Sequence, residues 1–209
     1  MPAPREIIDG LESILDVFVS NIRHRERVAF ILCDNLVELA CKTKAFQRNH
    51  TFNRRCSFHD ALNAPGVQLA PNGVGGRVQS RRDTRNTMQH GNAAVTVSLA
   101  HSADAIKDVC SVVNRLWPNS TGRMLRPQSR CVLRIVDLYS SNGDGAKQQR
   151  FEDLMRQCEW RGIADDRQPR LNEVIVESGL RVYWQYAIRQ SPELVEQVLI
   201  RLSHETDPP

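Results

Sequence analysis

The residue types best suited to chemistry in this chain lie in one short segment that ends at His90. Arg85 is followed directly by Asn86, and His90 lies five positions beyond the arginine. The planar guanidinium of arginine matches phosphate oxygens and stays charged at physiological pH, whereas histidine accepts and releases protons near neutral pH. These three residues, called the motif below, therefore indicate cleavage of a phosphodiester without a metal ion.

The spacing alone does not identify the motif, because Arg54 and His59 repeat the same interval without an asparagine after the arginine. In an arginine-rich chain, such pairs also arise by chance. Another interpretation of the motif is a helix terminus, where Arg85 caps carbonyl groups and His90 is a solvated surface residue. The surrounding elements must decide between these interpretations.

Hydrophobic periodicity predicts an all-helical first half of the chain. The predicted helices cover 5–19, 26–45, 56–63, 77–90 and 103–117. The second of these is apolar on nearly all sides, which is typical of a buried central helix. Ser102 is the expected N-cap of the last one, and the Gly- and Pro-rich residues 64–76 are expected to form a flexible loop.

The pattern changes after a polar linker at 118–130. The elements predicted beyond it are a strand at 131–139, a helix at 147–159, a hairpin of 172–177 and 180–188, and a helix at 192–202. We therefore predict an α+β chain with two domains. An N-terminal all-α bundle would cover 1–120, and a small β-α-β-β-α unit would cover 121–209.

Polar residues interrupt the apolar surface of the predicted central helix. Asp34, Asn35 and Glu38 fall within about one helical turn. They form either a solvated stripe or a row of auxiliary polar residues that faces the motif. Thr84 and Gln89, inside the motif segment, are further auxiliary candidates.

Basic residues follow the central helix and also precede the motif. Such runs are usually solvated surface, but this one would also suit a track for an RNA phosphate backbone. The candidate RNA-binding residues are Lys42, Lys44, Arg48, Arg54, Arg55, Arg81 and Arg82. The formal net charge of +4 and the pI of about 8.9 indicate a modestly basic protein.

Composition narrows the class of protein further. The six cysteines include no Cys-x2-Cys pair and no ladder of Cys and His ligands, so we expect no metal site and no cofactor. The N-terminus lacks the features of a signal peptide, and no apolar run approaches the roughly 20 residues that a membrane span needs. A cytoplasmic protein with no membrane partner is therefore expected.

A helical domain with a charged central helix, a long loop, Arg-Asn-x3-His-Gly and a closing helix resembles the HEPN superfamily. The resemblance covers about residues 5–120, and Arg85, Asn86 and His90 match the family motif Arg-x4–6-His, in which a polar residue most often follows the arginine. Arg54 lacks the asparagine and precedes the long loop. The resemblance implies a metal-independent endoribonuclease or a degenerate relative that only binds RNA. It also implies a homodimer in which two copies of the motif meet.

The chemistry of the motif agrees with this expectation. Cleavage of RNA by its own 2′-hydroxyl requires only proton transfer and charge stabilisation. His90 would act as general base or acid, Arg85 would stabilise the charge that grows on the phosphate, and Asn86 would orient either group. The products would carry a 2′,3′-cyclic phosphate and a 5′-hydroxyl.

Three functions stay open on the sequence alone. The first is a ribonuclease acting as a prokaryotic toxin or antiviral defence effector, with RNA, a second copy and an antitoxin or regulatory protein as partners. The second is a non-catalytic module that dimerises and binds RNA or protein. The third is an adaptor whose C-terminal unit recognises a protein. The intact motif favours the ribonuclease.

Overall fold

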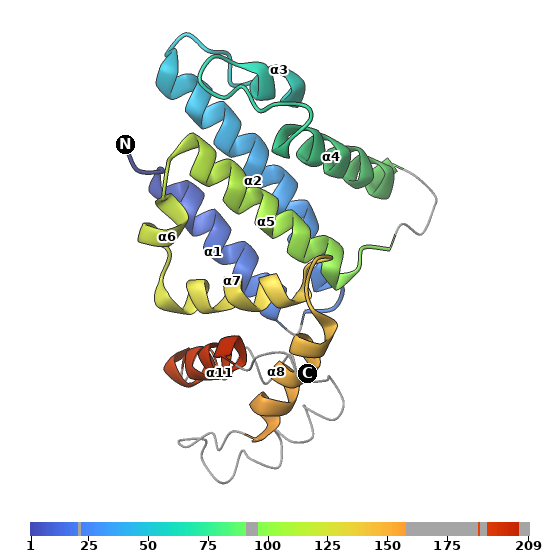
Figure 1. Cartoon of the computed structure of the whole chain (residues 1–209). Helices are drawn as coiled ribbons and strands as arrows, with labels where there is room; N and C mark the ends of the chain where they lie inside the picture. Colours follow the sequence, from blue (N-terminus) through green and yellow to red (C-terminus); the bar gives the residue numbers. More distant parts are fainter. Residues whose placement is uncertain (21, 91–95, 158–187, 189–191, 205–209) are drawn as a thin grey trace.

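The computed structural model describes residues 1–20, 22–90, 96–157, 188 and 192–204. Within these ranges the regular structure is helical, without a β-strand. The helices are α1 (Arg5–Val19), α2 (Arg25–Arg48), α3 (Phe58–Asn63), α4 (Val74–His90), α5 (Leu99–Leu116), α6 (Ser120–Met124), α7 (Pro127–Tyr139), α8 (Gly145–Gln157) and α11 (Pro192–His204). Figure 1 shows α1, α2 and α5 side by side, with α4 along one flank and α7 crossing one end.

Helix α1 is amphipathic and closes one side of the core. Its apolar residues recur every three or four positions, and Ile7, Leu11 and Phe18 are buried. Glu12 is also buried, and it accepts a hydrogen bond from the backbone N–H of Arg126 and pairs with its Nε, both at 2.7 Å. A buried carboxylate needs such a partner, and this pair ties α1 to the start of α7.

Helix α2 is the central helix, as the periodicity predicts, and it contacts α1, α3, α4 and α5. It is not buried on all sides, however. Asn35 is exposed, and Val28 and Leu39 keep 37% and 45% of their area exposed. One stripe of α2 therefore faces away from the bundle.

Helix α4 begins at Val74, inside the segment predicted as a loop at 64–76. The prediction rests on the glycines of this segment, but two of them lie in the first turn of the helix, packed against backbone. A Cβ on Gly76 would lie 1.9 Å from the carbonyl oxygen of Pro71, and one on Gly75 would meet the same segment at 2.5 Å. These glycines permit a close approach of two backbone segments. Helix α4 is described as far as His90, and residues 91–95 lie outside the described ranges.

Helix α5 begins one turn before the predicted start, and Ser98 rather than Ser102 is its N-cap. The Ser98 hydroxyl accepts a hydrogen bond from the His101 backbone N–H at 3.2 Å, and the His101 ring accepts one in return at 3.4 Å. Ser102 lies inside the helix, where its hydroxyl donates to the Glu26 carbonyl at 2.6 Å. That bond joins α5 to the start of α2.

The α+β prediction is wrong for the described residues, which are all helical. The segment predicted as a strand at 131–139 belongs to α7, and the predicted linker at 118–130 contains α6 and the first turn of α7. Pro127 occupies the first helical position, where its missing N–H costs nothing. The buried residues of α7 follow helical spacing: Ser129, Cys131, Val132, Ile135, Val136 and Tyr139.

The last two described helices, α8 and α11, pack against α7 and each other, and both are expected from the sequence. The hairpin predicted at 172–177 and 180–188 lies outside the described residues apart from Ile188. Buried hydrophobic residues form one cluster that extends from Ala3 to Leu202, and the domain boundary at residue 120 stays a prediction. No helix in the described ranges is long and apolar enough to cross a membrane.

Candidate functional site

Helix α4, which carries the motif, is attached to α2 and α5 mainly by arginines. Only three of its 17 residues are buried. Residues three or four apart on a helix share a side, so Arg77 and Arg81 reach α5, whereas Arg82 and Arg85 reach α2. Ion pairs therefore set the position of the motif.

Asp108 of α5 holds the first half of α4. Its buried carboxylate accepts hydrogen bonds from Nε of Arg77 and Nε of Arg81, both at 2.8 Å. Two guanidinium groups thus compensate for the burial of one carboxylate. Sequence reasoning missed Asp108 and Arg77, although an aspartate on the apolar face of a predicted helix was an available signal.

Arg82 binds two carboxylates of α2. Its Nη1 lies 3.1 Å from Oδ2 of Asp34 and 2.5 Å from Oε2 of Glu38. The guanidinium also lies over the Phe58 ring, 4.6 Å from its centroid. Glu38 pairs in addition with Lys42 at 2.6 Å. Asp34 and Glu38 therefore face α4, the helix of the motif.

Arg85 lies in the same contact but is held more loosely. Its Nε is 3.6 Å from Oδ2 of Asp34, beyond hydrogen-bond reach, and has no hydrogen-bond partner among the described residues. Its Nη1 donates to Oδ1 of Asn86 at 3.1 Å. The side chain keeps 20% of its area exposed. Nε of Arg85 is thus a buried donor without a hydrogen bond, and an anion could approach only the part of the side chain that stays exposed.

Burial and the neighbouring cations have opposite effects on the pKa values of Asp34 and Glu38. Burial raises the pKa of Asp34, and the opposing effect of Arg82 and Arg85 does not cancel it. Burial also acts to raise the pKa of Glu38, but hydrogen bonds from Lys42 and Arg82 outweigh it and lower that pKa. With both carboxylates ionised, three cations face two anions. One positive charge is left for an anionic ligand.

His90 ends α4 and is exposed to solvent. It follows Asn86 by four residues and shares its side of the helix, but it lies about 140° around the axis from Arg85. Arg27 of α2 fixes this end of α4, because its Nη2 donates to the Met88 carbonyl at 3.1 Å. The structure thus brings Arg85 and Asn86 together and leaves His90 on the outer face.

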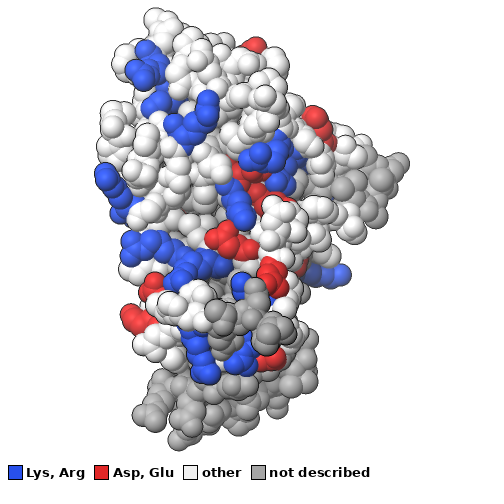
Figure 2. Space-filling view, in the orientation of Figure 1, with Lys and Arg blue, Asp and Glu red and all other residues white. Residues whose placement is uncertain are grey.

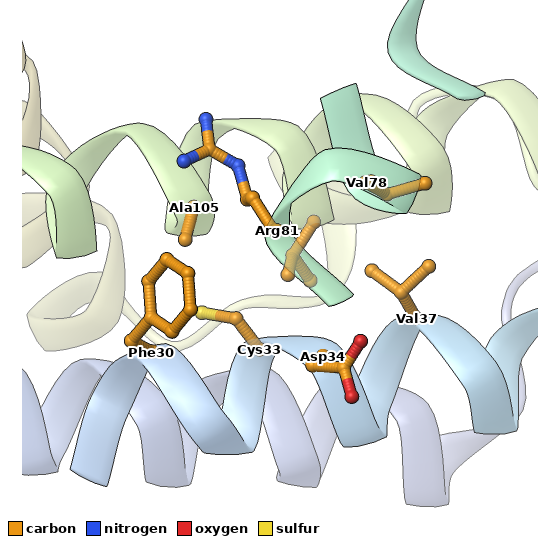
Figure 3. Close-up of a pocket in the computed structure, with 8 residues that line it drawn as sticks. Phe30, Cys33, Asp34, Val37, Val78, Arg81 and Ala105 are labelled. Carbon is orange, nitrogen blue, oxygen red and sulfur yellow. The ribbon is translucent and has the colours of Figure 1, made fainter. Parts of the chain in front are cut away.

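The interior where α2, α4 and α5 meet is closed to a substrate. Figure 3 shows a cavity there that Phe30, Cys33 and Arg81 help to line. Its volume of about 10 Å³ accommodates at most one water molecule. Burial raises the pKa of the Cys33 thiol, and that of Cys41 to about 12, so neither is an active nucleophile. A ligand of the motif would therefore have to bind from the outer surface.

The predicted RNA-binding side chains fall into two groups. One, engaged in ion pairs between or along the helices, is Lys42, Arg81 and Arg82. The other, in the last part of α2 and the segment after it, is Lys44, Arg48, Arg54 and Arg55. Lys44 lies over the Trp117 ring at 5.2 Å, and Arg54 over the Phe46 ring at 3.9 Å. Figure 2 shows Lys and Arg side chains at this end of the molecule and also across the middle of the same face.

Of the remaining auxiliary candidates, Asn35 on α2 and Gln89 on α4 are exposed. Thr84 on α4 is half-buried, and its hydroxyl donates to the Ser80 carbonyl at 3.1 Å. In the second arginine–histidine pair, Arg54 precedes α3, whereas His59 lies within α3 and contacts Asn63 at 3.2 Å. The motif, by contrast, lies on one helix beside two paired carboxylates. The structure therefore gives only the motif a surrounding charged cluster.

Within the described ranges, no three His, Cys, Asp or Glu side chains converge as metal ligands would. Comparisons with protein-family models, curated proteins and solved structures found no match. The function must therefore be inferred from the geometry of the chain's own residues.

Proposed function

We propose that the chain is a metal-independent endoribonuclease of the HEPN type that acts as a prokaryotic toxin or defence effector. The observation that carries the proposal is the partly free guanidinium of Arg85 at the contact of α2 and α4, bound to Asn86 and beside Asp34. A phosphate at this position would meet the one unbalanced positive charge of the cluster. His90, one turn beyond Asn86, supplies a group that transfers protons.

Each motif residue has a separate role in the proposed reaction. The 2′-oxygen forms a bond to phosphorus, and the bond from phosphorus to the 5′-oxygen breaks. His90 takes the 2′-hydroxyl proton or gives one to the leaving 5′-oxygen. Arg85 stabilises the negative charge that grows on the phosphate oxygens, and Asn86 holds its guanidinium. Products end in a 2′,3′-cyclic phosphate and a 5′-hydroxyl.

The active form in this proposal is a homodimer, because one copy presents Arg85 and His90 on different sides of α4. The exposed apolar side chains of Val28 and Leu39 on α2 offer a second copy a surface to pack on. Mixing Arg85→Ala protein with His90→Ala protein tests this. A composite site would recover part of the activity in the mixture, whereas a site within one copy would stay inactive.

Cleavage of end-labelled RNA in excess EDTA tests the reaction itself. Wild type should cut, and both Arg85→Ala and His90→Ala should fail to cut. Arg123→Ala on α6 and His204→Ala on α11 replace exposed residues of the same types and serve as controls. An absolute requirement for Mg²⁺, or products with a 3′-hydroxyl, would refute the proposed mechanism.

A non-catalytic RNA-binding module is the second candidate. It is favoured by the exposed Arg48 and Arg55 near the end of α2, which do not depend on the motif. In that case wild type would bind RNA without cutting it, and His90→Ala would bind equally well. In cells, a ribonuclease toxin should slow growth and His90→Ala should relieve the effect, whereas a binding module should show no such dependence.

A further inference from the structure

A groove of about 290 Å³ lies on the side of α4 that the ion pairs with α2 and α5 leave free. An apolar cavity of about 150 Å³ holds one benzene ring, so this groove has room for a two-ring base. Its lining comes from α3, the segment before α4, and α4 itself. The lining residues are His59, Leu62, Asn63, Leu69, Pro71, Gly75, Gly76, Gln79, Ser80 and Asp83.

The groove is built into the backbone. Gly75 and Gly76 allow the first turn of α4 to touch the segment that contains Pro71, where any Cβ would collide with carbonyl oxygens. The Leu69 N–H donates to the Leu62 carbonyl at 3.2 Å and fixes the same segment to α3. The two walls are therefore held at a set separation.

The wall formed by α4 offers hydrogen-bond acceptors. Nε2 of Gln79 donates to Oδ1 of Asp83 at 3.3 Å, which leaves the other carboxylate oxygen of Asp83 for a ligand. Oε1 of Gln79 is buried and has no hydrogen-bond partner among the described residues, and Gln79 is one of the residues that line the groove. This wall fits a ligand with adjacent N–H donors.

The opposite wall, formed by α3, offers a donor. Nδ2 of Asn63 donates to the His59 carbonyl at 2.9 Å and lies 3.2 Å from Nε2 of the His59 ring. If Nε2 accepts, the ring proton is on Nδ1, which can donate to a ligand. Leu62, Leu69 and Pro71 supply apolar surface for the faces of a ring.

Guanine is the RNA base that matches these walls. Its N1–H and exocyclic amine are adjacent donors on one edge, and its O6 and N7 are acceptors on another. Adenine and cytosine place an amine beside an acceptor nitrogen, and uracil places one N–H between two carbonyls. A carboxylate beside an amide oxygen therefore favours guanine.

The groove is aligned with the motif along α4. Gln79, Asp83, Asn86 and His90 are spaced four, three and four residues apart, so they share one side of the helix. Asp83 and His90 are about 10 Å apart along the axis. A strand with a base in the groove can therefore continue along α4 to His90.

We propose that this groove binds a guanine base of the RNA cleaved at the motif and thereby selects the cleavage position. That the base belongs to an RNA substrate rests on the ribonuclease function proposed above. Binding of the base is tested separately from cleavage, since free nucleotides require no reaction.

The test measures the affinities of GMP, AMP, CMP and UMP for the full chain by calorimetry. GMP should bind wild type at least about tenfold more tightly than the other three, as expected for a bidentate contact. Asp83→Asn should remove this preference, because an amide donor would oppose N1–H. Asp16→Asn, an exposed aspartate on α1, should keep it. Equal affinities in wild type, or a preference that survives Asp83→Asn, would overturn the proposal.

Ser80→Trp provides a second variant, which should fill the groove and abolish GMP binding while the Asp83 carboxylate itself is kept. Mapping cleavage of a random-sequence RNA separates the two proposals. A guanine at a fixed position from the cut, absent with Asp83→Asn, is the expected result. RNA cut without a fixed guanine would overturn the groove proposal alone, and GMP binding without any cleavage would overturn the ribonuclease alone.

Discussion

Arg82 and Arg85 lie one turn apart on α4 and approach the same carboxylate of Asp34 in different ways. Arg82 is 3.1 Å from it and also binds Glu38, whereas Nε of Arg85 is 3.6 Å away. Hydrogen bonds weaken steeply beyond their normal length. Arg82 therefore attaches α4 to α2 more firmly than Arg85 does. If Arg85 acts in catalysis as proposed, replacing Arg82 should mainly affect stability and replacing Arg85 should mainly affect activity.

We expect Arg82→Met to lower the free energy of unfolding by about 1–3 kcal/mol, because two carboxylates lose their shared cation. Arg85→Met should lower it by less than about 1 kcal/mol and slow RNA cleavage by about 100-fold or more. Urea unfolding and single-turnover cleavage measure the two effects. Equal losses of stability in both variants would contradict this division.

Glu38 leads to a prediction about pH, because Lys42 and Arg82 keep its pKa below its ordinary value of 4.5. A carboxylate whose pKa falls on folding stabilises the fold above its unfolded-state pKa and loses that contribution as pH falls through the folded-state pKa. Glu38→Gln should therefore be less stable than wild type at neutral pH, by roughly 1 kcal/mol or less. Urea unfolding from about pH 7 to pH 3 should show this difference shrinking on acidification, not growing.

At the scale of the elements, the sequence predicts a helix well where burial and local preference agree. The apolar stripe of α1 is an example. In α7 burial and local preference disagree. Val132, Ile135 and Val136 favour strands locally, but they are buried at helical spacing and the segment forms a helix. The sequence places Gly76 in a loop for a similar reason, since its close contact with Pro71 is tertiary.

The same limit applies to the candidate site. The sequence places the motif at the end of a helix and singles out Asp34 and Glu38, because they interrupt an apolar surface. Asp108 could have been singled out as an aspartate on an apolar helix face. Its pairing with Arg81 could not, because the two residues are 27 positions apart and meet only through the packing of α5. The groove was missed altogether, since three separate segments form it.

Two glycines in helices give a prediction for the start of α4. Alanine favours helix over glycine by up to about 1 kcal/mol, and a Cβ on Gly122 of α6 would meet nothing within 4 Å. Gly122→Ala should therefore be neutral or stabilising. Gly76→Ala should instead destabilise the fold by about 1–3 kcal/mol, because its Cβ would collide with the Pro71 carbonyl. Thermal unfolding of both variants compares them, and a stabilising Gly76→Ala would show that the segments separate easily.

At the scale of the whole molecule, some arginine side chains form ion pairs between helices and others are exposed at the surface. Those of α4 are paired with Asp34, Glu38 and Asp108, whereas Arg48 and Arg55 are exposed. Basic side chains are visible at that end in Figure 2. Attraction of RNA should therefore come from the end of α2, at a distance from the proposed chemistry on α4.

The salt dependence of RNA binding tests this arrangement. Replacing Arg48 and Arg55 with Ala should weaken binding and flatten the plot of log affinity against log salt by about 0.7 for each phosphate that the variant no longer neutralises. Arg123→Ala should leave the slope unchanged. Fluorescence anisotropy of a labelled RNA between about 50 and 200 mM salt measures the slopes. Identical slopes for all variants would place the phosphate track elsewhere.

The buried cysteines of α2 have a practical consequence. Cys33 and Cys41 are inaccessible in the folded state, and burial raises the pKa of each thiol. A thiol reagent can reach them only when this part of the bundle opens, so alkylation should proceed at the intrinsic rate multiplied by the open fraction. Mass spectrometry of the alkylated chain over time would thus report the free energy of local opening at two positions of the central helix, with no label added. The same experiment with GMP present would show whether occupying the groove slows that opening.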